Sequence, residues 1–115
     1  MRILFIVVFA IVNSYASKYS ELFFSGNCSS CHFKNTAVSA PSILEIKQRY
    51  ITAFPKQEDF VNHMSTWVKK PNFKTSLMND AIKKYEIMPE LGFDLDTIKI
   101  ISLYIYKNNF NTKRP

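Results

Sequence analysis

Apolar residues recur at helical spacing along most of the chain after residue 42. A separation of three or four residues places side chains on one face of a helix, and a globular protein buries that face. The recurring apolar positions are Ile43, Ile46, Tyr50 and Phe54, then Phe60, Met64, Trp67 and Val68, and finally Ile98, Ile101, Tyr104 and Ile105. No stretch alternates with the period of two that is typical of a half-buried strand. We therefore predict an all-α fold.

Prolines and acidic residues set the limits of these helices. Pro55 ends the first of them, because proline lacks the backbone donor that a helix needs. Glu58 and Asp59 lie in the first turn of the next, where acidic side chains complement the helix dipole. Asp94 or Asp96 can cap the last. The predicted helices span residues 18–25, 43–54, 57–70, 77–85 and 94–108.

Residues 1–16 have the pattern of a secretory signal peptide. Arg2 is followed by the apolar run 3–12 and then by small and polar residues that end at Ala16. This run is too short to cross a hydrocarbon core of about 30 Å, which needs about 20 apolar residues. We expect cleavage after Ala16 and export of residues 17–115 as one domain. An uncleaved N-terminal membrane anchor is the alternative.

The chain is basic, with 15 Lys and Arg residues against 9 Asp and Glu residues and a formal charge of +6. Removal of Arg2 with the leader leaves +5. Such an excess suits nucleic acid, an anionic membrane or an acidic protein partner. An exported chain meets little nucleic acid, so we expect protein partners, no nucleic acid, and a soluble monomer after cleavage.

The run Cys28-Ser29-Ser30-Cys31-His32 matches the C-x-x-C-H attachment site for c-type haem. Two thiols at this spacing can each form a thioether to one of the two haem vinyl groups. The neutral imidazole of His32 then supplies the proximal iron ligand. The motif therefore predicts one covalently attached haem c, with its iron, held through Cys28 and Cys31.

The same cysteines have other interpretations. A C-x-x-C redox pair is typical of a βαβ context, and half of a zinc site would need a second ligand pair. The chain has no other cysteines, its only other histidine is His63, and no βαβ pattern is visible. A disulfide across two residues would close a very small loop and stabilise little. A thiol-based function would leave His32, Pro41 and Met88 unexplained.

Met88, followed by Pro89, is the candidate for the second axial ligand. A thioether is a soft, neutral iron ligand, and the proline stops the helix beside it. Most methionines at helical spacing fill cores, which is our interpretation of Met64 and Met78. His63, within a predicted helix, is the rival ligand.

These features together resemble class I cytochromes c, particularly the small bacterial periplasmic monohaem proteins. The shared positions are Phe24, four residues before Cys28, Pro41, nine residues after His32, Met88-Pro89 before the last helix, and Tyr104 within it. The resemblance implies four to five short helices wrapped around one haem. It also implies that the Pro41 carbonyl accepts a hydrogen bond from the imidazole of His32, and that Tyr104 packs on the first helix.

Two departures from the family pattern matter, and the role of one further residue, Trp67, stays open. Ser20 replaces a glycine that often lets the first and last helices cross closely, so a wider or shifted crossing is expected. The segment 55–85 is longer than in the smallest members, which leaves the covering of the haem edge open. Trp67 either donates its indole N–H to a haem propionate or packs as an ordinary core residue.

The expected function is one-electron transfer, without enzymatic catalysis, between exported redox proteins or membrane respiratory complexes. Lys34, Lys83 and Lys84 are the expected docking cations, because they flank the motif and Met88. The alternative is a peroxidatic or small-ligand-binding haem protein in which Met88 is displaced or absent from the iron. The sequence offers no acid–base group for that chemistry beyond His63.

Overall fold

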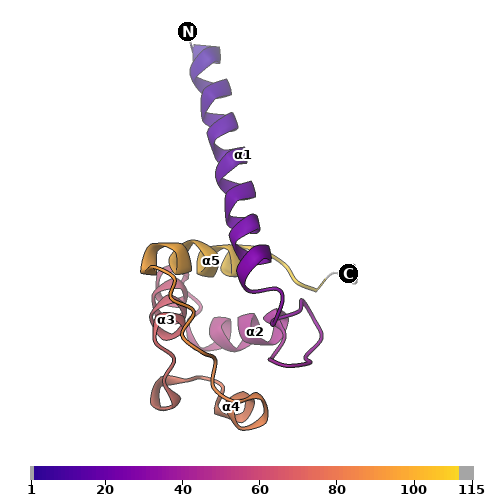
Figure 1. The fold of residues 1–115 in the computed structure, drawn as a ribbon. Helices are drawn as coiled ribbons and strands as arrows, with labels where there is room; N and C mark the ends of the chain where they lie inside the picture. Colours follow the sequence, from indigo (N-terminus) through magenta and orange to yellow (C-terminus); the bar gives the residue numbers. More distant parts are fainter. Residues whose placement is uncertain (1, 112–115) are drawn as a thin grey trace.

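The computed structural model describes residues 2–111, with the side chains of residue 2, 4–6 and 9–17 left out. Five α-helices follow one another: α1 (Arg2–Asn27), α2 (Ile43–Ala53), α3 (Gln57–Lys69), α4 (Asn79–Tyr85) and α5 (Leu95–Lys107) (Figure 1). A single 3-10 turn, η1 (Phe73–Thr75), precedes α4. Residues 2–111 contain no strand, so the predicted all-α class is confirmed.

α1 is far longer than the helix expected over 18–25, and that prediction was wrong in extent. Neither glycine nor proline occurs between residues 2 and 25, so nothing in the sequence interrupts the helix there. The expected cleavage point after Ala16 lies inside α1, which projects from the body and packs on α5 near its C-terminal end (Figure 1). Within the described part of the chain, none of the helices combines the length and apolar character needed to cross a bilayer.

The core lies where α3 and α5 pack against each other, with α1 and α2 closing it. Its buried residues are Phe24, Ile43, Tyr50, Phe60, Met64, Ile101, Ile105 and Phe110. Most of them stand on the predicted apolar faces, and burying each such side chain is worth about 1.5–3 kcal/mol. Phe110 lies beyond the end of α5 and was not predicted to be buried.

Local hydrogen bonds explain where the helices begin. The Ser42 hydroxyl accepts from the Glu45 backbone N–H at 3.2 Å and caps α2. α4 begins at Asn79 rather than residue 77, because Met78 has a non-helical backbone and donates its N–H to the Ser76 hydroxyl at 3.0 Å. Asp94 precedes α5 as predicted, and its carboxylate accepts from the Thr97 hydroxyl.

An aromatic cluster joins the first and last helices. The rings of Phe24 in α1 and Tyr104 in α5 lie 5.1 Å apart, centroid to centroid. Phe110 adds a third ring, 5.7 Å from Phe24 and 6.2 Å from Tyr104. The expected packing of Tyr104 on the first helix is therefore observed. Because Phe24 lies one turn before Cys28, this cluster fixes the end of α1 from which the motif emerges.

Candidate functional site

The Cys28–His32 motif continues the last turn of α1. The Cys28 N–H donates to the Phe24 carbonyl at 2.9 Å, and the His32 N–H donates to the Cys28 carbonyl at 2.9 Å. Cys31 also bonds back to the Cys28 carbonyl, at 3.3 Å. Both thiols and the imidazole are thus carried on one turn of backbone, anchored through Phe24 to the core.

The imidazole of His32 has one nitrogen already bonded. Its Nδ1 atom lies 2.8 Å from the carbonyl oxygen of Pro41. A carbonyl oxygen can only accept, so Nδ1 carries the proton, and Nε2 keeps the lone pair that a metal ligand needs. This arrangement is the one implied by the resemblance, and it is present in the protein alone.

Two backbone bonds bring Pro41 back to His32. The Ile43 N–H donates to the Phe33 carbonyl, and the Leu44 N–H donates to the Lys34 carbonyl, both at 2.9 Å. The first residues of α2 are thereby tied to the residues that follow His32. No local sequence pattern predicts these two backbone hydrogen bonds, although Ser42 marks the start of the helix that makes them.

The surroundings of Cys28 do not favour a reactive thiolate. Burial, and secondarily the nearby Cys31, raises the pKa of Cys28 to about 11, and neither cysteine forms a disulfide. Reactive cysteines have lowered pKa values and often sit at helix N-termini, whereas these follow the C-terminal end of α1. Among the described residues, no group of three or more His, Cys, Asp or Glu side chains is placed to hold a metal ion.

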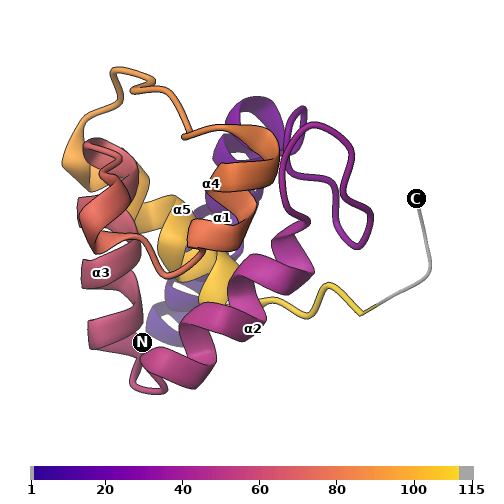
Figure 2. The same ribbon diagram turned by 90° about the horizontal axis from the view of Figure 1, so that it is seen from below.

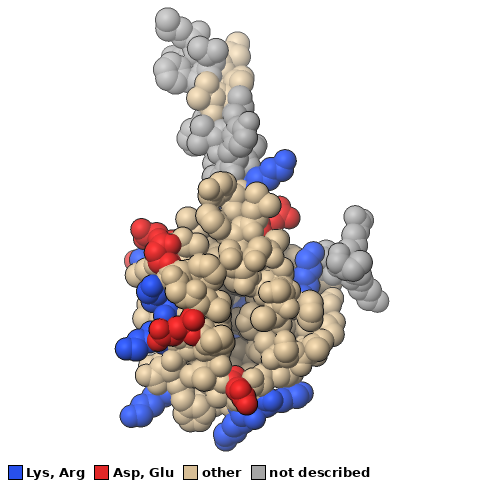
Figure 3. Space-filling view, in the orientation of Figure 1, with Lys and Arg blue, Asp and Glu red and all other residues tan. Residues whose placement is uncertain are grey.

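Met88 lies half-buried in the α4–α5 connection. This connection turns at Glu86 and Gly92, which have φ values of 71° and 76°. Figures 1 and 2 place the connection and the 28–42 loop on opposite sides of one face of the molecule. Figure 3 shows a hollow in that face between them. The structure thus places the segment that contains Met88 across this face from the loop that carries the motif.

The other candidates have different partners. Met64 and Met78 are buried, 3% and 7% exposed, so their interpretation as core residues is confirmed. His63 is exposed, and its ring stacks on Phe54 with the centroids 3.8 Å apart. Trp67 donates its indole N–H to the Asn72 carbonyl at 2.9 Å, so that donor is used within the chain.

The residues present fit a covalently attached haem. Two uncrosslinked thiols and an imidazole with a free Nε2 are the groups that covalent attachment and proximal ligation of a c-type haem require, and Met88 is the candidate for the second ligand. Two pockets, of about 510 Å³ and 260 Å³, lie along α2, and none of these donors lines them.

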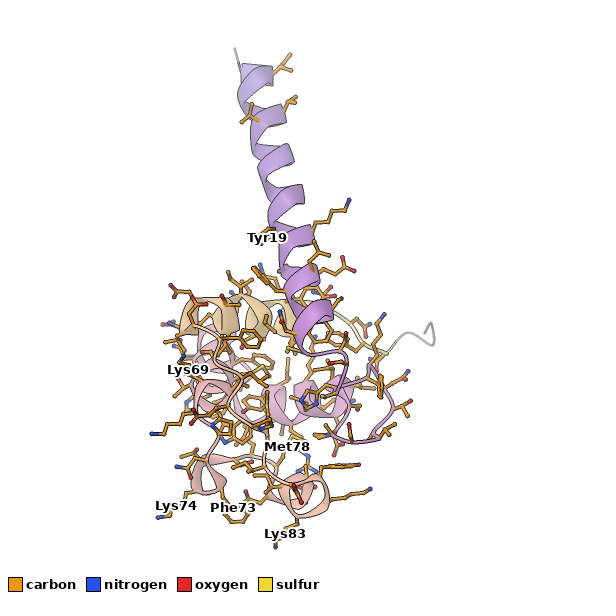
Figure 4. All side chains as sticks on the ribbon, viewed as in Figure 1. Tyr19, Lys69, Phe73, Lys74, Met78 and Lys83 are labelled. Carbon is orange, nitrogen blue, oxygen red and sulfur yellow. The ribbon has the colours of Figure 1, made fainter. Side chains whose placement is uncertain are left out.

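The expected docking lysines lie on the surface. Lys34, Lys83 and Lys84 are exposed, and the Lys84 Nζ atom lies 5.2 Å from the centre of the Tyr85 ring. Lys83 lies at the end of the body farthest from α1 (Figure 4). The Lys83–Lys84 pair is therefore at the α4 end of the molecule, a few residues before Met88.

No protein-family model matches the chain, and it has no match among curated proteins or solved structures. Its function is therefore inferred from its residues and their geometry.

Proposed function

We propose that this protein is an exported one-electron carrier of the class I cytochrome c type, with one haem c bound through Cys28 and Cys31. The observation that carries this proposal is the hydrogen bond between His32 Nδ1 and Pro41 O, made beside two uncrosslinked thiols. The bond orients the ring and selects its tautomer, as partners of metal-ligating histidines do.

Each site residue has a defined task in this proposal. Cys28 and Cys31 bind the haem covalently, and His32 supplies Nε2 as the proximal ligand. Pro41 holds the imidazole and raises its basicity through the Nδ1 hydrogen bond. Met88 supplies its sulfur as the second iron ligand. When bound, the haem supplies an iron that exchanges one electron reversibly.

The redox character follows from these ligands. A neutral thioether favours the ferrous state relative to a second imidazole, so the reduction potential is expected to exceed that of a bis-histidine haem. No substrate has to reach the iron, and no residue has to move a proton. The protein is accordingly proposed to be a carrier and not an enzyme.

The cellular setting is part of the same proposal. Residues 1–16 direct export to the periplasm, and the carrier works there as a soluble monomer. Its donor and acceptor are exported redox proteins or membrane respiratory complexes with acidic docking surfaces. A peroxidatic role would require an acid–base group near an open iron position, and His63 stacks on Phe54 instead.

The test is an optical and redox study of the full chain made in a host that attaches c-type haem. We expect a c-type spectrum and a single one-electron transition. His32→Ala should lose the low-spin spectrum, whereas His63→Ala should keep it. A parent protein without haem absorbance, or equal spectra for the two variants, would contradict the proposal.

A further inference from the structure

α4 has few contacts with the rest of the protein. None of its residues is buried, and it belongs to none of the helix pairs with the closest association, which are α3–α5, α1–α5, α2–α5 and α2–α3. The chain is anchored just before the helix, where Leu77 packs on the core and Met78 is buried. What holds the helix itself therefore matters for the segment that follows it.

A two-bond ion pair joins α4 to α2. The Arg49 Nη1 atom donates to Asp80 Oδ1 at 2.9 Å, and Nη2 makes a second, shorter bond to Oδ2. Glu45, one turn earlier in α2, also accepts from Nη2, at 3.2 Å. The planar guanidinium matches a carboxylate in both bonds, so the pair sets orientation as well as distance.

Only a few residues separate the end of α4 from Met88, so the orientation of this helix affects the position of Met88. The Glu86 N–H donates to the Ile82 carbonyl at 2.8 Å and ends the helix. Glu86 then adopts φ 71° and ψ 169°, a conformation that residues with a side chain rarely take and that surrounding structure must hold. Met88 follows two residues later, so a shift of α4 displaces its sulfur.

We propose that Arg49 and Asp80 form a latch that holds α4 on α2 and thereby positions Met88 for the haem iron. The role of the latch in positioning Met88 rests on the proposed function, whereas its role in holding α4 against α2 does not. Arg49 and Asp80 are positioning residues, since neither one supplies an iron ligand.

A surface ion pair adds little to the global stability of a protein. It nevertheless governs local opening where other contacts are few, because small elements open independently of the core. Both side chains are partly exposed, 36% for Arg49 and 61% for Asp80, so salt should weaken the latch.

Hydrogen exchange of the full chain, followed by mass spectrometry, tests the latch directly. Arg49→Gln and Asp80→Asn should each raise the exchange rate of the α4 amides by about two- to five-fold at low salt, as expected for loss of a surface ion pair. Glu45→Gln is the matched control, since it removes the negative charge of the other Arg49 partner and leaves the Asp80 carboxylate unchanged. The double variant should exchange no faster than the faster single variant, because both changes break one interaction. Unchanged α4 exchange in both single variants would overturn the latch.

The near-infrared band of methionine ligation, recorded on the same haem-loaded variants, tests the second step. The band should weaken in Arg49→Gln and Asp80→Asn and persist in Glu45→Gln. Faster α4 exchange with an undiminished band would overturn the positioning of Met88. Absence of the band from the parent protein would instead contradict Met88 ligation in the proposed function, and the exchange rates would still decide whether the latch exists.

Discussion

The Nδ1 atom of His32 and the carbonyl oxygen of Pro41 lie 2.8 Å apart, although nine residues separate them in the chain. Two backbone hydrogen bonds between residues 33–34 and 43–44 close the intervening loop. A histidine held in this way has a fixed ring and a fixed tautomer before any metal arrives. A metal-ligating side chain that is held rigidly in this way does not have to rearrange before it binds the metal.

Met88→Ala should abolish the near-infrared charge-transfer band of the ferric protein, because no thioether then remains in the α4–α5 connection. The same variant should lower the reduction potential or admit an external ligand to the iron. The measurement is the near-infrared spectrum with a redox titration.

The other buried methionines provide the control for this result. Met64→Ala should keep the band while lowering the free energy of unfolding by about 2–5 kcal/mol, since Met64 lies in the core. Met78→Ala should also keep the band. If Met78→Ala removes the band and Met88→Ala does not, the ligand precedes α4 and our assignment is wrong.

Tyr50 should make stability fall at alkaline pH. Burial raises its pKa from 10.0 to about 12, so the folded protein holds the phenolic proton where the unfolded chain has lost it. Tyr50 makes its full contribution to the free energy of unfolding below about pH 10, and this contribution is lost as the pH rises toward 12. Between pH 9 and pH 11 the parent should lose about 1 kcal/mol more than Tyr50→Phe in the free energy of unfolding. Identical pH profiles from urea titrations would show that the phenol is not buried.

Lys83 and Lys84 should steer an acidic redox partner. Changing both to Glu should slow electron transfer to an acidic acceptor at low salt without altering the haem spectrum, because surface charges act within a Debye length of about 10 Å at moderate salt. Stopped-flow rates measure the effect, and high salt should shrink it.

A variant of equal charge separates steering from net charge. Lys56→Glu with Lys107→Glu changes the charge by the same amount at two exposed positions outside the segments next to the motif and Met88. It should slow the reaction less. Equal slowing by both double variants would indicate that total charge, rather than a docking face, controls the rate. We expect little steering from the tail cations Lys113 and Arg114, which lie outside the described residues.

The helices of the body could be predicted because local signals agree with burial. In α2 and α3 the apolar period ends at Pro55 and just before Pro71, and the structure ends both helices within a residue of the prediction. The length of α1 was missed because its polar middle was interpreted as the end of a leader, although no helix breaker stands there. η1 was missed because its turn depends on Asn72, whose side chain accepts from the Lys74 N–H at 2.8 Å.

The candidate site was predictable only in part. The motif predicts the donors, and the resemblance adds the Pro41 contact, which periodicity alone does not contain. The Arg49–Asp80 pair spans 31 residues and depends on how α4 returns to α2, so no local pattern indicates it. Trp67 had two equal interpretations, and its bond to the Asn72 carbonyl is decided by a turn that the sequence does not reveal.

Intact-mass measurement of the protein purified from a host that attaches c-type haem tests the central claim most directly. We predict the polypeptide mass plus one haem, retained through extraction with acidified organic solvent. Cys28→Ala or Cys31→Ala should weaken this retention, and the double variant should lose the covalent haem entirely. A mass equal to the bare polypeptide, from a host shown to load another c-type protein, would contradict the account.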